Sequence, residues 1–105
     1  MSTVVAVRHP VEDFEKWKLV FDEHRAVRES HDARGHWLLV DHNEPGTQLI
    51  LNEFPNRQAA EAFASDPSLA KAMARAGVSG PPRIEFYELA ERVDYWAPPA
   101  DTMKG

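Results

Sequence analysis

The sequence predicts an α+β fold in which helices cover one face of a four-stranded antiparallel sheet. Two β-rich runs flank the turn cluster at residues 41–46, which is typical of a hairpin. A further β-rich run lies at residues 3–8, and another follows the proline pair at 81–82. Two segments with apolar residues at helical spacing separate these runs from the hairpin. The predicted order is therefore β-α-β-β-α-β, the arrangement called ferredoxin-like.

The hairpin is expected over residues 34–54. Both of its runs carry apolar side chains on their two alternating faces, whereas a sheet with one face in water alternates apolar and polar residues. We therefore expect the helices to cover one face and a second copy of the chain to cover the other. His36 and Trp37 are neighbours and must point to opposite faces, so only one of them can face the helices.

The segment before the hairpin predicts a strand over Thr3–Arg8, ended by His9 and Pro10 because proline cannot donate to a β-ladder. From residue 11 the spacing becomes helical, with an acidic first turn and arginines toward the end, as the helix dipole favours. The pattern predicts one continuous helix of about five turns that stops at Gly35. Its inward face carries Phe14, Trp17, Val20, Phe21, His24, Val27 and His31.

The segment after the hairpin predicts two shorter helical pieces. Asn56 is the expected N-cap of residues 57–64, and Asp66 with Pro67 starts a second piece that ends at Gly77. Residues 77–82 are expected to form a loop and residues 83–93 the last strand. We expect one domain over residues 1–94 and an extended tail over 95–105, whose Tyr95 and Trp96 pack on a neighbour.

Composition excludes several classes of function. The chain has 12 Lys and Arg against 17 Asp and Glu, a formal charge of -5, which opposes binding to nucleic acid. It has no cysteine, so disulfides, cysteine-based zinc sites and thiol nucleophiles are excluded, and a cytoplasmic location is expected. No stretch approaches the roughly 20 apolar residues of a membrane span. The five histidines match no metal-ligand spacing, so no metal site is expected.

Five stretches together resemble a known family. They lie at residues 4–17, 49–54, 59–63, 66–67 and 84–88. In these stretches the chain resembles the dimeric α/β-barrel superfamily, and most of all its small domains of the antibiotic-biosynthesis-monooxygenase type. The resemblance implies a homodimer with a pocket between sheet and helices in each subunit. In some members this pocket oxidises phenolic or polyketide-derived substrates with oxygen and no cofactor, while others cyclise polyketides or degrade haem.

Three residues are candidates for catalysis. His24 interrupts the apolar face of the first helix, where a histidine can act as a general base or can instead be a core residue bonded to backbone. Asn52 interrupts an apolar strand, where its amide can stabilise an oxyanion or hold a loop. His36 is a second candidate for that oxyanion. The resemblance also implies an Asn and a Trp on or just after the third strand: Asn52 matches the first, and Phe54 stands in place of the second.

Six further residues are candidates for substrate binding. Trp17, Phe21 and Phe54 are expected to hold a flat ring, although aromatic residues at such spacing also form plain core. Arg28 lies one turn beyond His24 and either lines the cavity or is a cation at a helix end. The remaining candidates for the pocket wall are Phe63 and Tyr87.

These residues lead to one main functional hypothesis and two alternatives. The main hypothesis is a small cofactor-independent monooxygenase or cyclase that acts on an aromatic or polyketide-like molecule. The first alternative is a non-catalytic dimeric domain, such as a stress-related one, that binds a small apolar molecule. It predicts an apolar pocket in which backbone groups satisfy His24. The second alternative is haem or metal binding through one histidine, which an absorption spectrum and elemental analysis would test.

Overall fold

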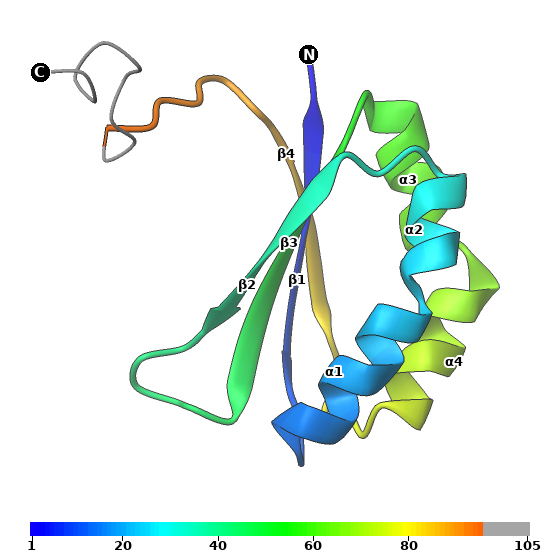
Figure 1. The fold of residues 1–105 in the computed structure, drawn as a ribbon, viewed down its shortest axis with the longest axis vertical. Coiled ribbons are helices and arrows are strands. Elements are labelled where there is room, and N and C mark those ends of the chain that lie inside the picture. Colours follow the sequence, from blue (N-terminus) through cyan, green and yellow to red (C-terminus); the bar gives the residue numbers. More distant parts are fainter. Residues whose placement is uncertain (96–105) are drawn as a thin grey trace, which may run out of the picture.

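The computed structural model describes residues 1–95 of the chain. Its strands form one antiparallel sheet in the order β2-β3-β1-β4, and the helices all lie on one side of it (Figure 1). The elements are β1 (Thr3–Pro10), α1 (Phe14–Glu23), α2 (Arg25–Ser30), β2 (Gly35–Val40), β3 (Thr47–Phe54), α3 (Arg57–Ala64), α4 (Pro67–Arg75) and β4 (Arg83–Glu88). The predicted ferredoxin-like α+β fold and its central hairpin are confirmed. None of these helices is both long and apolar enough to cross a lipid bilayer.

The pairing of the strands decides which side chains face the helices. Asn52 on β3 pairs with Val5 on β1 and with His36 on β2. Directly paired residues point to the same face of a sheet, and Val5 is fully buried in the core beneath the helices. Asn52 and His36 therefore face the helices, while Trp37 and Glu53 point to the open face.

The first helical segment is broken, contrary to the expectation of one continuous helix. α1 begins after Asp13, whose carboxylate accepts a hydrogen bond from the Glu15 N–H at 3.0 Å. It ends at His24, and α2 begins at the next residue. At this break the Phe21 carbonyl accepts a hydrogen bond from the Arg28 side chain at 2.7 Å. A side chain that bonds to a carbonyl inside the helical ladder is a known cause of such interruptions.

α2 ends at Ser30 rather than near Gly35, which corrects the predicted glycine stop. Asp32 adopts a left-handed backbone conformation with φ of 67°. Aspartate tolerates this region because its short side chain can bond locally. The N–H of Ala33 then bonds to the Arg28 carbonyl at 3.0 Å and closes the helix end. Gly35 is instead the first residue of β2.

The second pair of helices begins and ends where the sequence predicts. Asn56 caps α3, with its Oδ1 accepting from the Ala59 N–H at 2.8 Å. Asp66 caps α4 in the same way through the Ser68 N–H at 2.9 Å, with Pro67 in the first turn. Gly77 follows α4 with φ of 80°, a conformation that glycine adopts without strain. These caps orient α4 along the cavity described below.

Two strand ends differ from the prediction. β1 continues through Pro10, which pairs with Thr47 on β3. The pairing with β4 has already ended at Arg8, so this proline has a strand neighbour on one side only. β4 ends at Glu88 rather than at residue 93. Glu88 pairs with Thr3, the first residue of β1, and one further backbone bond follows, from the Leu89 N–H to the Ser2 carbonyl at 2.8 Å. Tyr95 is 93% exposed. The predicted contact of Trp96 and the rest of the tail falls outside the described residues.

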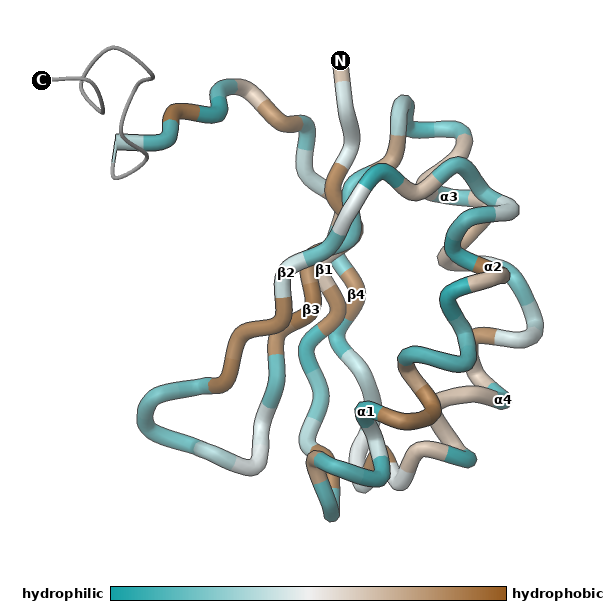
Figure 2. The backbone as a smooth tube through the Cα atoms, viewed as in Figure 1, coloured by the Kyte–Doolittle hydropathy of each residue, from teal (hydrophilic) through white to brown (hydrophobic). Residues whose placement is uncertain are grey.

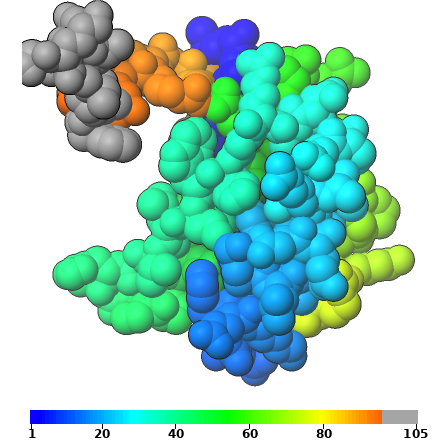
Figure 3. Space-filling model, in the orientation of Figure 1, coloured from blue at the N-terminus to red at the C-terminus, as the bar shows by residue number. Residues whose placement is uncertain are grey.

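The core lies between the sheet and the helices, while the open face exposes apolar side chains beside the Arg92–Glu53 ion pair. Val5, Phe54 and Phe63 are at most 2% exposed. On the open face, Trp37 and Leu39 are each 45% exposed. Figure 2 shows brown, hydrophobic stretches along the strands and a teal β2–β3 turn. In Figure 3 this turn projects from the body of the molecule.

One residue of the predicted inward helix face does not reach the core. Phe14 is the first residue of α1 and is 45% exposed, although its ring lies 6.0 Å from that of Trp17. Trp17 and Val20, one and two turns on, are buried as expected. The helix therefore turns its apolar face fully toward the sheet only from its second turn.

Candidate functional site

A cavity of about 50 Å³ lies between the sheet and the helices. On this scale one water needs roughly 10–15 Å³, so the space holds a few waters but no large ligand without movement of side chains. Its wall is mostly apolar, with four polar or charged members, His9, His24, Arg28 and Asn52. The apolar members are Val7, Trp17, Val20, Phe21, Ile50, Phe63, Leu69, Ala72, Met73 and Ala76.

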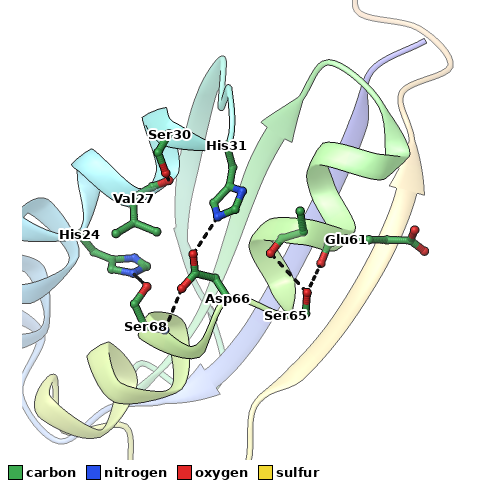
Figure 4. Close-up of polar contacts among 9 residues, drawn as sticks. His24, Val27, Ser30, His31, Glu61, Ser65, Asp66 and Ser68 are labelled. Carbon is green, nitrogen blue, oxygen red and sulfur yellow. Dashed lines mark hydrogen bonds and ion pairs between the residues drawn. The ribbon is translucent and has the colours of Figure 1, made fainter.

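His24 lies in this wall at the junction of α1 and α2, and it is 8% exposed. Its Nε2 is 2.9 Å from the hydroxyl oxygen of Ser68 in the first turn of α4 (Figure 4). The contact is to a side chain and not to backbone. Burial, followed by the positive charge of Arg28, lowers the pKa of His24 below its usual 6.5. The imidazole is therefore neutral at neutral pH and able to accept a proton.

Asp66 connects His24 to a second histidine. Its Oδ2 is 2.8 Å from Nε2 of His31, and its Oδ1 accepts from the Ser68 N–H (Figure 4). The bond from His31, then those from Ser68, lower the pKa of Asp66 to about 2. In one of its two neutral tautomers, His24 donates from Nε2–H to the Ser68 hydroxyl oxygen. That arrangement leaves Nδ1 of His24 as the basic nitrogen.

The Asp66–His31 contact predicts a pH-dependent contribution to stability. Asp66→Asn keeps a capping oxygen but removes the negative charge. Because the pKa of Asp66 is lower in the folded state, its contribution is present above about pH 4 and is lost as the pH falls toward 2. We expect urea unfolding at pH 6 to show wild type more stable than Asp66→Asn, with a smaller difference at pH 3. A difference that stays constant with pH would contradict the assignment.

Asn52 lines the same cavity as His24, from the sheet side. It is 3% exposed, and its Oδ1 has no hydrogen-bond partner in the described part of the chain. An amide can be turned so that either its oxygen or its NH₂ group faces a ligand. A buried amide without a partner normally needs one, so a ligand or water is expected to bind there.

His9 and Gln48 were not among the candidates, and the structure makes them notable. They pair directly on β1 and β3, and both face the helices. His9 lines the cavity, with an unpartnered Nδ1 and a pKa that burial lowers. Both amide atoms of Gln48 are likewise unpartnered within residues 1–95. Gln48 lies two residues before Ile50 and four before Asn52 on β3. Alternate residues of a strand share a face, so this spacing was the sequence signal that Gln48 faces the helices.

Comparison with known proteins identifies the fold. No family model and no curated protein matches the sequence. Among solved structures, a candidate antibiotic biosynthesis monooxygenase from Caulobacter crescentus has a TM-score of 0.68 at 18% identity, covering 86% of this chain and 91% of that one. SnoaB, a cofactor-independent oxygenase from Streptomyces nogalater, has a TM-score of 0.66 at 12% identity, covering 88% and 95%. The chain has the fold of the antibiotic-biosynthesis-monooxygenase-like proteins.

The same monooxygenase-like fold occurs without an assigned activity. The protein NE2512 from Nitrosomonas europaea, described as of unknown function, has a TM-score of 0.65 at 20% identity, covering 88% of this chain and 92% of that one. At such identities the likeness concerns the fold alone. It confirms the resemblance found in the sequence at that level, and the chemistry must be argued from this chain's own residues.

The predicted aromatic residues divide between the cavity and its surroundings. Trp17, Phe21 and Phe63 line it, and the rings of Trp17 and Phe21 stack with centroids 4.9 Å apart. Phe54 does not line it: the ring is fully buried beneath Phe63, 5.1 Å away. Tyr87 pairs with Val4 on the open face of the sheet, and its hydroxyl donates to Glu85, so it does not meet the cavity.

His36 faces the helices but lies outside this cavity. Its ring is edge-on to Phe21 at 4.9 Å, and the residue lines a second, neighbouring cavity of about 210 Å³. Arg28 lines both cavities. Of the three predicted catalytic residues, the structure thus brings His24 and Asn52 to one cavity and His36 to the other. Within residues 1–95, no three potential metal ligands come together.

Proposed function

We propose that this protein is a small cofactor-independent oxygenase or cyclase acting on an aromatic or polyketide-like substrate. The observation that carries the proposal is His24: a buried, neutral imidazole that contacts Ser68, in the same cavity as Asn52, whose Oδ1 has no partner within residues 1–95. A base beside a polar group in an apolar chamber suits the formation of a resonance-stabilised anion. SnoaB, a cofactor-independent oxygenase with the same fold, supports the same class.

In the proposed mechanism, Nδ1 of His24 removes a proton from an acidic C–H or O–H group of the substrate. The Asn52 amide donates to the oxygen on which negative charge develops. In an oxygenase, the anion reacts with O₂, so that a CH₂ group becomes C=O, with one oxygen atom retained and the other leaving as water. In a cyclase, the anion attacks a carbonyl of the same molecule. Trp17 and Phe21 hold the ring.

Substrate binding requires the cavity to widen. Pockets for drug-sized ligands are roughly 300–1,000 Å³, well above the about 50 Å³ present here. Leu69 and Met73 line the side formed by α4, and methionine repacks readily because its side chain is unbranched. We expect these two side chains to move outward when a ring binds between α4 and the Trp17–Phe21 pair.

Oxygen uptake tests this function. With a panel of anthrones and quinols, we expect the protein to consume oxygen and convert an anthrone to the matching quinone, with heat-denatured protein as the control. The small apolar cavity specifically favours one rival, a non-catalytic binding domain. An anthrone that binds, as seen by calorimetry, without any oxygen uptake or cyclised product above the control would support the rival and contradict the enzyme.

We further propose a homodimer that packs open face on open face. Trp37, Leu39 and Tyr87 are 45 to 52% exposed on this face, and large apolar side chains exposed on one face of a sheet suit an interaction site. A two-fold arrangement would bury them against their copies. Light scattering at micromolar concentration is expected to give twice the mass of one chain.

Leu39→Glu should break this dimer. A charge on this face cannot be buried in a dimer interface without a partner, so we expect a monomer at micromolar concentration. Leu19→Glu is the matched control, because Leu19 is 68% exposed on α1, on the other side of the molecule. The proposal is wrong if wild type is monomeric, or if both variants remain dimers.

A further inference from the structure

Arg28 is a buried cation at the junction of the two cavities. It is 4% exposed and lines both of them. Its Nη1 donates to the Phe21 carbonyl at 2.7 Å, and its guanidinium carbon lies 3.7 Å from the centre of the Phe21 ring. Burial lowers the pKa of Arg28 to about 10, so the group still carries its charge at neutral pH.

This charge has no acidic partner in the described part of the chain. Arg28 forms no ion pair with a carboxylate of residues 1–95. Asp22 and Glu29 act on it only from a distance. Each is engaged elsewhere, since Lys18 binds Asp22 at 2.7 Å and Arg25 lies 3.3 Å from Glu29. Buried charges are normally paired, because an isolated charge out of water is costly.

The surroundings of Arg28 leave room for an anion. The second cavity, of about 210 Å³, is larger than the first and is lined by Arg25, Arg28, Glu29, Ala33, Arg34, Gly35 and His36. On the other side, the first cavity offers the rings of Trp17 and Phe21. An anion at Arg28 would therefore have a polar space on one side and an aromatic wall on the other. Two other cations line this space: Arg25 lies 3.3 Å from Glu29, and Arg34 donates to the Ser2 hydroxyl at 3.2 Å.

We propose that Arg28 binds the carboxylate of an aromatic acid, whose ring rests against the Trp17–Phe21 pair. The Arg28 guanidinium suits a negatively charged group, and its remaining N–H donors suit the two oxygens of a planar carboxylate. The inference rests on the proposed function only in naming the substrate class: the enzyme's substrates would be aromatic carboxylic acids. Binding itself requires no turnover.

Equilibrium binding of simple probes tests this inference. Calorimetry or NMR titration compares benzoate with its neutral counterpart benzamide at pH 7. We expect wild type to bind benzoate at least ten-fold more tightly than benzamide, and Arg28→Met to lose that preference. Arg57→Met is the matched control: Arg57 is exposed on α3 and pairs with Glu61 at 3.2 Å, so its loss should leave benzoate binding unchanged.

Three outcomes would overturn the inference. In the first, wild type binds benzoate and benzamide equally. In the second, Arg28→Met binds benzoate as tightly as wild type does. In the third, wild type binds phenyl phosphate ten-fold more tightly than benzoate. If Arg28→Met fails to fold, Arg28→Lys, which keeps the charge but loses the planar fork, should weaken benzoate binding several-fold. If the protein binds benzoate but takes up no oxygen, the anion site is supported and the proposed oxygenase activity is contradicted. If it turns over neutral anthrones but does not bind benzoate, the activity is supported and the anion site is contradicted.

Discussion

Replacing His24 with glutamine should lower the rate of oxygen uptake with an anthrone substrate by about 100-fold or more, the usual scale of a lost general base. Glutamine can still bond to Ser68, which holds the imidazole at 2.9 Å, but it accepts no proton near neutral pH. The loss should appear in kcat more than in KM, because proton removal belongs to the transition state. Oxygen-electrode traces at saturating substrate measure it.

The control and the pH profile make this result specific. His42→Gln makes the same change in the exposed β2–β3 turn and should leave the rate unchanged. A base acts in its neutral form, and the pKa of His24 is lowered, so the wild-type rate should be constant above pH 6.5 and fall only at more acidic pH. Equal oxygen uptake by wild type and His24→Gln would rule out the oxygenase mechanism.

Replacing Phe63 with alanine should lower the free energy of unfolding by about 3–5 kcal/mol, the usual cost of removing a buried phenylalanine. Phe63 is 2% exposed. The centroid of its ring lies 5.1 Å from that of Phe54 and 6.1 Å from those of His24 and His31. It thus joins the core to both histidines. Urea unfolding followed by circular dichroism measures the change.

Phe14→Ala is the matched control for this variant. It removes the same side chain from a position that is 45% exposed, so we expect a loss of less than half that of Phe63→Ala. A similar loss for both variants would mean that the contacts of Phe63 do not hold α3 against the sheet. Phe63→Leu, which keeps most of the apolar volume, should be intermediate.

The parts of the fold that depend on local chemistry could be predicted from the sequence. Asn56 and Asp66 cap helices because their side chains reach the N–H groups two or three residues on, and Gly77 ends α4 because it tolerates positive φ. The hairpin follows from its turn residues in the same way. Each of these interactions lies within a few residues of its cause.

Features that depend on distant contacts could not be predicted. The break at His24 coincides with the bond from Arg28 to the Phe21 carbonyl, and no helical periodicity reveals a side chain that turns back on its own helix. Strand parity was also hidden, because both faces of the sheet are apolar. Tyr87 was therefore placed in the pocket although it lies on the open face. Only the register with Val4 decides this.

The polar members of the cavity show the same limit. Asn52 was recognised because it interrupts an apolar run, and the structure places it beside the cavity. The sequence does not single out His9, because Pro10 predicts a strand end at Arg8. In the structure β1 runs through Pro10, and the rings of His9 and Trp17 lie 6.0 Å apart between centroids. A strand end misplaced by two residues thus concealed a buried imidazole.

The position of β1 at the centre of the sheet has a consequence for synthesis on the ribosome. β1 pairs with β3 on one side, where Thr3 lies opposite Phe54. It pairs with β4 on the other side, where Thr3 lies opposite Glu88. At translation rates of about 5–20 residues per second, the newly made strand waits roughly 3–10 s for its first neighbour and longer for its second. During that interval the backbone N–H and C=O groups of this valine-rich strand have no partner and can pair with other chains. Slower elongation before residue 54 should therefore raise the demand for chaperones.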